Sequence, residues 1–225
     1  MRIIKYGVTL RRIEESDIEL VRTWRNKDEI RKNMLFQEYI TPEMQKKWFD
    51  SINNFSHSYY IIEYNNEKIG LINEKNIDTE NNTVESGLFL FGEKHYGSFI
   101  PVIASIILIE IGYYLFEGNI GYIHVRKDNK KAIEYNETIG YYILEEMEEF
   151  YIMAITKQSF ESKTVKLRNA IKNLYGDQNT QFILDQVDFE NGVAEACLNI
   201  LNSLEEDKIK YKDIKYNYLN VLLDF

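Results

Sequence analysis

The sequence contains very little cysteine, proline or histidine. Its 225 residues include one cysteine, Cys197, two prolines and three histidines. A single cysteine excludes an intramolecular disulfide framework and a cysteine-based zinc site. His57, His95 and His124 are scattered without metal-ligand spacing, so we expect no metal site. The hydrophobic content of 44% and the charged content of 28% are typical of a soluble globular protein.

The chain also lacks an excess of positive charge. Its formal net charge of −9 argues against a nucleic-acid-binding protein, which needs a basic surface to displace counterions. The charge is unevenly distributed, because residues 1–50 hold 11 basic and 9 acidic side chains, whereas the remainder has a net charge of −11. The N-terminal part is therefore the better candidate for contact with an anionic ligand.

Signals for membranes and secretion are missing as well. No apolar run follows Met1 and Arg2, so no signal peptide is visible and we expect a cytoplasmic protein without a membrane partner. One long apolar run, residues 99–116, contains Glu110 and has no flanking Lys/Arg asymmetry. A helix that is apolar on all sides is also typical of a helix buried against a sheet, which is our interpretation of this run.

The hydrophobic patterns predict an alternating order of strands and helices. Helix starts are indicated by Ser16, with Glu19 as a capping box, and by Thr41-Pro42. Asn65-Asn66 indicates a hairpin turn. The expected order is β-α-α-β-β-β-α-β-α-β-β. The expected strands are 8–13, 58–64, 68–77, 83–91, 120–125, 141–146 and 150–156.

Residues 160–225 have a different pattern, which we interpret as three or four short helices. The expected helices are 163–175, 178–187, 192–204 and 209–223. We therefore divide the chain into a first domain, 1–158, and an all-α C-terminal extension, 159–225. The extension is too short to hold much core alone, so we expect it to pack on the first domain or to form a homodimer with a second copy.

The most informative stretch is 122–141. An apolar strand leads into Asn129, a short helix follows, and the helix ends at Gly140, just before the aromatic Tyr141. Ala132 lies three residues after Asn129. This spacing, together with the order of elements over about residues 6–157, resembles the GNAT acyltransferases. The resemblance implies a mixed α+β fold with a central sheet of about seven strands flanked by helices.

The resemblance further implies an acetyltransferase that uses acetyl-CoA. In this family the strand before the long helix supplies backbone groups for the pantetheine arm, here Phe89, Leu90 and Phe91. Glu85 occupies the position of the family's general base. The family often has a tyrosine seven residues after the asparagine, near the sulfur of the coenzyme. This chain has Asn136 there, which can still donate a hydrogen bond.

The phosphate-binding loop departs from the family pattern of Gln/Arg-x-x-Gly-x-Gly/Ala. If the pattern is aligned by counting back from the end of the long helix, only its last small residue is matched. If it is aligned on Gly97, the glycine is matched but the helix becomes longer. Pro101 removes one N–H group that could contact phosphate. The resemblance assigns to the coenzyme Tyr96, Gly97, Ser98, Asn129 and Ala132.

The N-terminal part resembles GNAT enzymes that acetylate the amine of amino-sugar nucleotides, of the pseudaminic acid pathway type. This resemblance rests on the run Trp24-Arg25-Asn26 and on Trp48. An arginine guanidinium can bind phosphate through two parallel hydrogen bonds, and an aromatic ring can stack on a base or a sugar. The expected substrate-binding residues are Arg25, Asn26, Arg31 and Trp48, whereas Trp24 continues an apolar helix face and is expected in the core.

Three functions remain open at this point. The first is acetyl transfer from acetyl-CoA to a small-molecule amine, with an amino-sugar nucleotide as the preferred acceptor. The second keeps the chemistry but acetylates a protein N-terminus. The third is a degenerate GNAT domain, with an eroded phosphate loop, that acts as a binding or assembly module.

Overall fold

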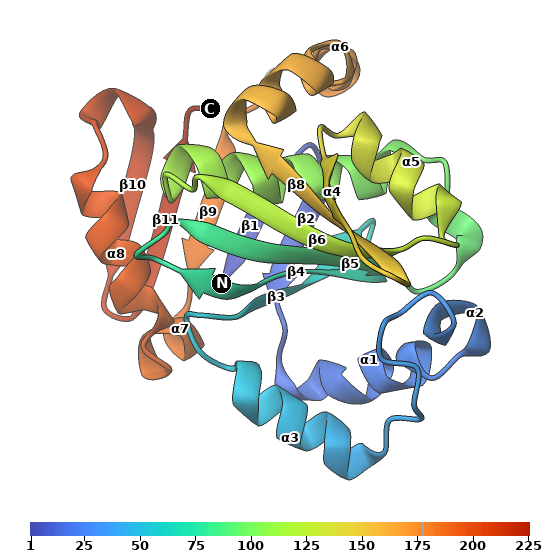
Figure 1. Cartoon of the computed structure of the whole chain (residues 1–225). Coiled ribbons are helices and arrows are strands. Elements are labelled where there is room, and N and C mark those ends of the chain that lie inside the picture. Colours follow the sequence, from blue (N-terminus) through green and yellow to red (C-terminus); the bar gives the residue numbers. More distant parts are fainter. Residues whose placement is uncertain (177) are drawn as a thin grey trace.

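A single eleven-stranded β-sheet runs through the computed structural model, which describes residues 1–176 and 178–225 (Figure 1). The strand order is β10-β11-β9-β1-β2-β3-β4-β5-β6-β8-β7. The strands are β1 (Arg2–Lys5), β2 (Val8–Arg12), β3 (Ser58–Tyr64), β4 (Glu67–Asp78), β5 (Thr83–Leu90), β6 (Ile120–Arg126), β7 (Tyr142–Glu146), β8 (Phe150–Thr156), β9 (Thr180–Leu184), β10 (Ile209–Lys215) and β11 (Tyr218–Leu223). The helices are α1 (Ile18–Arg25), α2 (Asp28–Arg31), α3 (Pro42–Ile52), α4 (Phe99–Glu110), α5 (Lys130–Thr138), α6 (Lys157–Tyr175), α7 (Gln186–Glu190) and α8 (Val193–Ser203).

Helices cover both faces of this sheet. On one face α1 and α3 bury a small core that includes Val21, Phe49 and Ile61. On the other face α4, α5, α6 and α8 contribute to the larger core (Figure 1). Trp24 packs against the smaller core and stacks on Phe91 with ring centroids 5.7 Å apart, which confirms its expected place.

The apolar run 99–116 forms α4 and a π-helical turn, Ile111–Leu115. Nine of the twelve α4 residues are buried against the sheet, as expected for a helix that is apolar all round. Among the residues described, no helix combines the length and the apolar character that crossing a bilayer requires.

Local signals placed most elements of the first 158 residues correctly. Thr41 caps α3 by accepting a hydrogen bond from the Met44 N–H at 3.2 Å, and Asn65-Asn66 forms the β3–β4 turn with positive φ angles of 49° and 62°. The capping box expected at Ser16 was wrong. Glu14 and Asp17 form it instead, and the buried Asp17 carboxylate also pairs with Arg11 at 2.9 Å.

The expectation of an all-α extension was wrong. β9 pairs with β1 and β11 pairs with β9, so these strands lengthen the main sheet beyond its N-terminal edge. Alternation of buried Leu219, Val221 and Leu223 in β11 is a period of two, which identifies a strand rather than a helix. Asn217, with φ of 55°, closes the β10–β11 hairpin.

The expected count of about seven strands was therefore too low. The four additional strands are β1, a four-residue strand beside β2, and the extension strands β9, β10 and β11. The extension is anchored by a buried contact, because Lys5 Nζ donates to Glu110 Oε2 at 2.8 Å and to the Phe225 carbonyl at 2.6 Å. A buried ammonium needs such partners to offset its lost hydration.

The glycine that ends α5 is required by a close approach between two segments. Gly140 has a φ of 108°, and a Cβ there would lie 2.9 Å from Phe160 Cα and from the Ser159 carbonyl oxygen. The positive φ agrees with the expected left-handed cap. Gly140 thus lets α6, the first element after residue 156, pack directly on the end of α5.

We expect Gly140→Ala to lower the free energy of unfolding by about 2 kcal/mol or more, because it adds a backbone clash to a strained φ. Gly192→Ala is the matched control, since Gly192 has a φ of 78° but a Cβ there would meet no atom within 4 Å. The control should cost only about 1 kcal/mol. Denaturant unfolding of both variants measures the difference, and equal losses would contradict this packing account.

Candidate active site

The two parallel strands β5 and β6 separate after a short ladder. They pair only at Thr83–Ile120, Val84–Gly121 and Glu85–Tyr122, although the strands are eight and seven residues long. Beyond Glu85 the strands diverge, and their facing backbone groups have no partner strand. This divergence leaves a wedge in the middle of the sheet that opens toward the N-terminus of α4.

The register of β4 and β5 determines which backbone groups face the wedge. The Phe91 N–H donates to the Ile69 carbonyl at 2.8 Å, and neighbouring residues in an antiparallel ladder alternate between the two sides. Phe89 and Phe91 therefore bond to β4. Leu90, Leu88 and Ser86 direct their N–H and C=O groups toward β6. Of the three expected coenzyme contacts, Leu90 thus has its backbone groups in the wedge.

The N-terminus of α4 stands at the open end of this wedge. Ser98 is the cap residue, and its hydroxyl accepts a hydrogen bond from the Ile100 N–H at 3.4 Å and donates to the His95 carbonyl. Gly97 has a φ of 76°, and a Cβ there would meet nothing within 4 Å. This arrangement favours the alignment on Gly97, because the helix is lengthened by the π-helical turn.

These features fit a diphosphate-bearing coenzyme. First-turn amides of a helix are unbonded within the helix and attract anions, and Gly97 leaves open space beside them. Phe99, which is 44% exposed, stands where the family pattern has a small residue. Lys94 adds no unpaired positive charge at the N-terminus of α4, because its ammonium pairs with Glu67 at 2.6 Å.

Glu85 lies where the wedge begins, on the sheet face that carries α1 and α3. Three side chains contact its carboxylate: Lys75 Nζ at 2.9 Å, His124 Nδ1 at 3.0 Å and Asn76 Nδ2 at 3.0 Å. Lys75 and Asn76 are adjacent in β4 and would point to opposite faces of a regular strand. An irregularity between Lys75 and Asp78, with Asn76 at a φ of 52°, brings both side chains to Glu85.

The environment of Glu85 keeps its carboxylate ionised. Burial by itself raises the pKa of Glu85, but the hydrogen bonds and charges of Lys75 and His124 outweigh burial and hold the pKa below its usual value. An ionised carboxylate only accepts hydrogen bonds, so the His124 Nδ1 must donate to it. In a neutral His124 the Nε2 atom is then an acceptor.

A depression with a volume of about 400 Å³ lies beside this group. Its lining includes Glu85, Tyr122 and His124 together with Leu144 and Glu145 of β7. The residues that sequence reasoning missed here are Lys75, Asn76, Tyr122, His124 and Glu145. The alternation of Tyr122 and His124 along one strand face was the available signal for two of them.

The helix α5 holds the remaining motif residues. Asn129 caps it by accepting a hydrogen bond from the Ala132 N–H at 3.2 Å. The Asn136 amide donates to the Ala132 carbonyl at 2.7 Å, which leaves its second N–H for a ligand. The Tyr135 hydroxyl is hydrogen-bonded to the Ser105 hydroxyl and to the Pro101 carbonyl, so Tyr135 packs on α4.

The four expected substrate residues all have partners within the protein. The Asn26 side chain bonds both backbone groups of Ile40 at 2.8 Å, and Arg31 pairs with Asp28. Two of the residues contact aromatic rings. The Arg25 guanidinium lies 5.9 Å from the Phe89 ring, and the Trp48 ring meets the Tyr59 ring edge-on at 5.1 Å. Their roles toward a substrate stay predictions.

Comparison with known proteins decides the family. The profile of the acetyltransferase (GNAT) domain matches residues 8–142, which is more than half of the chain. The chain belongs to the GNAT acetyltransferase family. It is therefore an N-acetyltransferase domain, and acetyl-CoA is the acyl donor of this family. No curated protein matches the sequence.

Solved structures show the same fold at low identity. Spermidine N-acetyltransferase from Vibrio cholerae, in complex with CoA and spermine, has a TM-score of 0.63 at 15% identity, covering 69% of this chain and 99% of that one. Aminoglycoside acetyltransferase AAC(6')-Ib, in complex with coenzyme A, has a TM-score of 0.60 at 19% identity, covering 69% and 98%. This GNAT chain thus carries residues beyond those that its neighbours share.

We expect Lys75→Met to raise the pKa of Glu85, because it removes a cation and a hydrogen bond that now favour the carboxylate. The acid limb of the pH profile of kcat/KM should move to higher pH, since Glu85 then protonates at higher pH. Carbon-13 NMR titration of the Glu85 carboxyl group measures the pKa directly. Lys210→Met, which removes an ion pair with Asp224 at the far edge of the sheet, is the control. An unchanged Glu85 titration would contradict this reading.

Proposed function

We propose that the protein transfers an acetyl group from acetyl-CoA to the primary amine of a small cationic molecule, with Glu85 as the general base. One observation carries the proposal. An ionised carboxylate, in contact with His124, lies where β5 and β6 separate and faces an open depression that has a second carboxylate, Glu145.

The chemistry requires a neutral amine near the donor. Acetyl-CoA supplies a thioester carbonyl for attack and a thiolate as leaving group. Glu85 is placed to attract the ammonium form of the acceptor and to remove a proton through His124 or a water molecule. A thiol has a reference pKa of about 8.5, so the sulfur can leave as a thiolate near neutral pH without being protonated by a strong acid. Asn136 is the family-implied donor beside the sulfur.

The charge around the depression supports a cationic acceptor. Two carboxylates, Glu85 and Glu145, line it. Several cations of the N-terminal part are already paired, as in Arg22 with Glu19 and Arg31 with Asp28. The spermidine N-acetyltransferase structure contains spermine, and a structure of AAC(6')-Ib contains ribostamycin. Both ligands carry several amino groups, which agrees with this class.

An amino-sugar nucleotide is the alternative acceptor that the sequence favoured. It needs a free arginine fork or an open aromatic face for the nucleotide. Arg25 is the best remaining candidate, because no carboxylate is paired with it among the described residues. The protein N-terminus and the binding-module alternatives have no specific observation in their favour. A homodimer stays a prediction.

Replacing the base tests the mechanism. We expect Glu85→Gln to lower kcat by roughly 10²–10⁴, because the amide cannot accept the proton. Binding of acetyl-CoA should be retained, since Glu85 faces away from α4. Glu148→Gln, an exposed carboxylate in the β7–β8 turn, is the matched control. A Glu85→Gln enzyme with the wild-type rate would end this assignment.

A panel of acceptors tests the substrate class. Spermidine, an aminoglycoside, a nucleotide-linked amino sugar and a peptide with a free N-terminus should be compared by kcat/KM with acetyl-CoA. We expect the polycationic amines to be the best acceptors, and Glu145→Gln to raise their KM. Preference for the nucleotide sugar would favour the alternative. No acetylation of any acceptor, together with no thermal shift by acetyl-CoA, would favour the binding module.

A further inference from the structure

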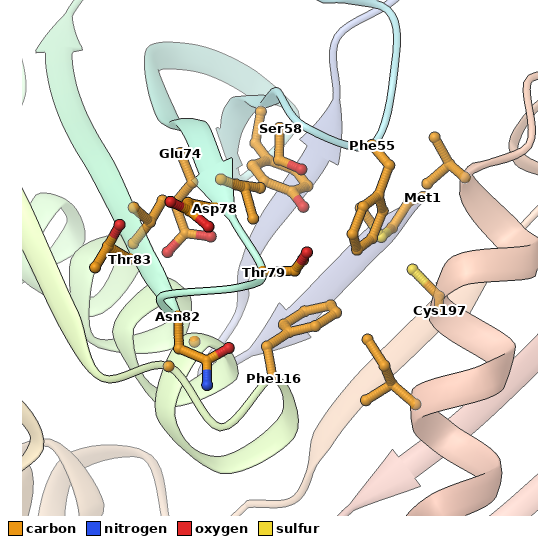
Figure 2. A pocket seen from close by; sticks show the side chains of 17 residues that line it. Met1, Phe55, Ser58, Glu74, Asp78, Thr79, Asn82, Thr83, Phe116 and Cys197 are labelled. Carbon is orange, nitrogen blue, oxygen red and sulfur yellow. The ribbon is translucent and has the colours of Figure 1, made fainter.

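A second cavity lies on the opposite face of the sheet and at the opposite end of β5 from the wedge. Its volume is about 110 Å³, and it lies between β4, the π-helical turn and α8 (Figure 2). Thr83 and Val84, at the start of β5, line both this cavity and the depression at Glu85, but Glu74 and the extension residues line only this cavity. The extension forms one wall, through Val193, Cys197 and Ile200.

Most of the lining is apolar or aromatic. Phe55 and Phe116 face each other across one side, with ring centroids 6.3 Å apart (Figure 2). The buried Tyr60 and Cys197 continue this surface. A cavity lined in this way holds the apolar body of a small ligand well.

One carboxyl group points into this apolar space. Glu74, on β4, lines the cavity, and no described residue gives it a hydrogen bond or an ion pair. Gly112 in the π-helical turn leaves room for it, because a Cβ there would lie 3.5 Å from Glu74 Oε1. Glu74 is half-buried, and its carboxyl oxygens stay open to the cavity, so they have hydrogen-bonding capacity left for a ligand.

The second carboxylate at the cavity, Asp78, is already hydrogen-bonded within the protein. It accepts hydrogen bonds from the Glu80 and Asn81 N–H groups at 2.9 and 3.0 Å and from the Asn81 side chain at 2.7 Å. Asp78 therefore holds the β4–β5 turn, and Glu74 is the group that has capacity left for a ligand.

We propose that this cavity binds a small primary amine with a short apolar body, whose ammonium group pairs with Glu74 and whose chain contacts Phe55 and Phe116. An ammonium satisfies the carboxylate, and aromatic faces attract cations as well as apolar chains. An anion is excluded by Glu74 and Asp78. The volume, compared with about 150 Å³ for a cavity that holds benzene, suits a ligand of roughly six heavy atoms.

Binding of an amine should release a proton near neutral pH. Burial raises the pKa of Glu74 to about 8, so the empty site holds a neutral carboxyl group at pH 7 and the ammonium ligand ionises it. Above pH 9 the carboxylate is already ionised and release should vanish. The other titratable groups around Glu74 are Asp78, Tyr60, Tyr113, Tyr141, Cys197 and the Met1 amino group, which pairs with Asp188.

Calorimetric titration of the full chain with n-pentylamine tests the proposal. The matched ligand n-pentanol has the same length without the charge. We expect pentylamine to bind more tightly than pentanol, and heats measured at pH 7 in phosphate and in Tris buffer to differ by the released proton. Glu74→Gln, which keeps the shape, should weaken pentylamine binding by about tenfold or more and abolish proton release, while pentanol binding stays unchanged.

A second variant tests the location. Ile200→Phe fills the cavity from the partly buried face of α8 and should abolish binding of both ligands, while neither variant touches the depression at Glu85. Crystals soaked with pentylamine should place its nitrogen within hydrogen-bond distance of Glu74. Pentylamine binding that survives both variants belongs to the acetyl-acceptor site and overturns the proposal, as does equal binding of pentylamine and pentanol or no binding of either. Each outcome is independent of whether Glu85 is the catalytic base.

Discussion

The proposed function of this molecule depends on a parallel ladder that stops after three residue pairs. β5 and β6 are joined at Thr83 to Glu85 and then diverge, although each is bonded to another strand on its far side. A buried backbone group without a partner is costly, so an unfilled wedge is a stable feature only where a ligand or solvent satisfies it. The wedge thus defines where an extended coenzyme can add its own polar groups to the sheet.

The two faces of the sheet contribute different groups to the candidate site. The side with α4 supplies the helix N-terminus at the open end of the wedge, and the side with α1 and α3 supplies the carboxylate at its closed end. An irregularity in β4 brings Lys75 and Asn76 together on Glu85. This contact keeps Glu85 ionised and fixed. For the proposed base this has a cost, because a lowered pKa weakens proton abstraction.

Much of the first domain could be predicted from the sequence because its signals are local. Caps such as Thr41 and Asn129, the Asn65-Asn66 turn and the motif from Asn129 to Gly140 act within a few residues, and the structure has them as expected. The prediction for the extension was wrong for the opposite reason. The short strand β9 pairs with β1, a segment about 180 residues away, and β11 pairs with β9, and no local pattern records these partners.

The candidate site was predictable only in outline for the same reason. Glu85 followed from a family position, whereas Lys75 and His124 join it through strand pairing and a bulge that sequence spacing does not reveal. Asn26 illustrates the converse. Its residue type suits a substrate hydroxyl, yet the structure uses both ends of its amide to hold Ile40.

The most direct test of this account is a crystal structure of the protein with coenzyme A. The account predicts the pantetheine arm between β5 and β6, bonded to the backbone of Ser86, Leu88 or Leu90, with the sulfur near Glu85 and the diphosphate at the amides that follow Gly97. Coenzyme bound elsewhere, or β5 and β6 closed into a continuous ladder beyond Glu85, would contradict it.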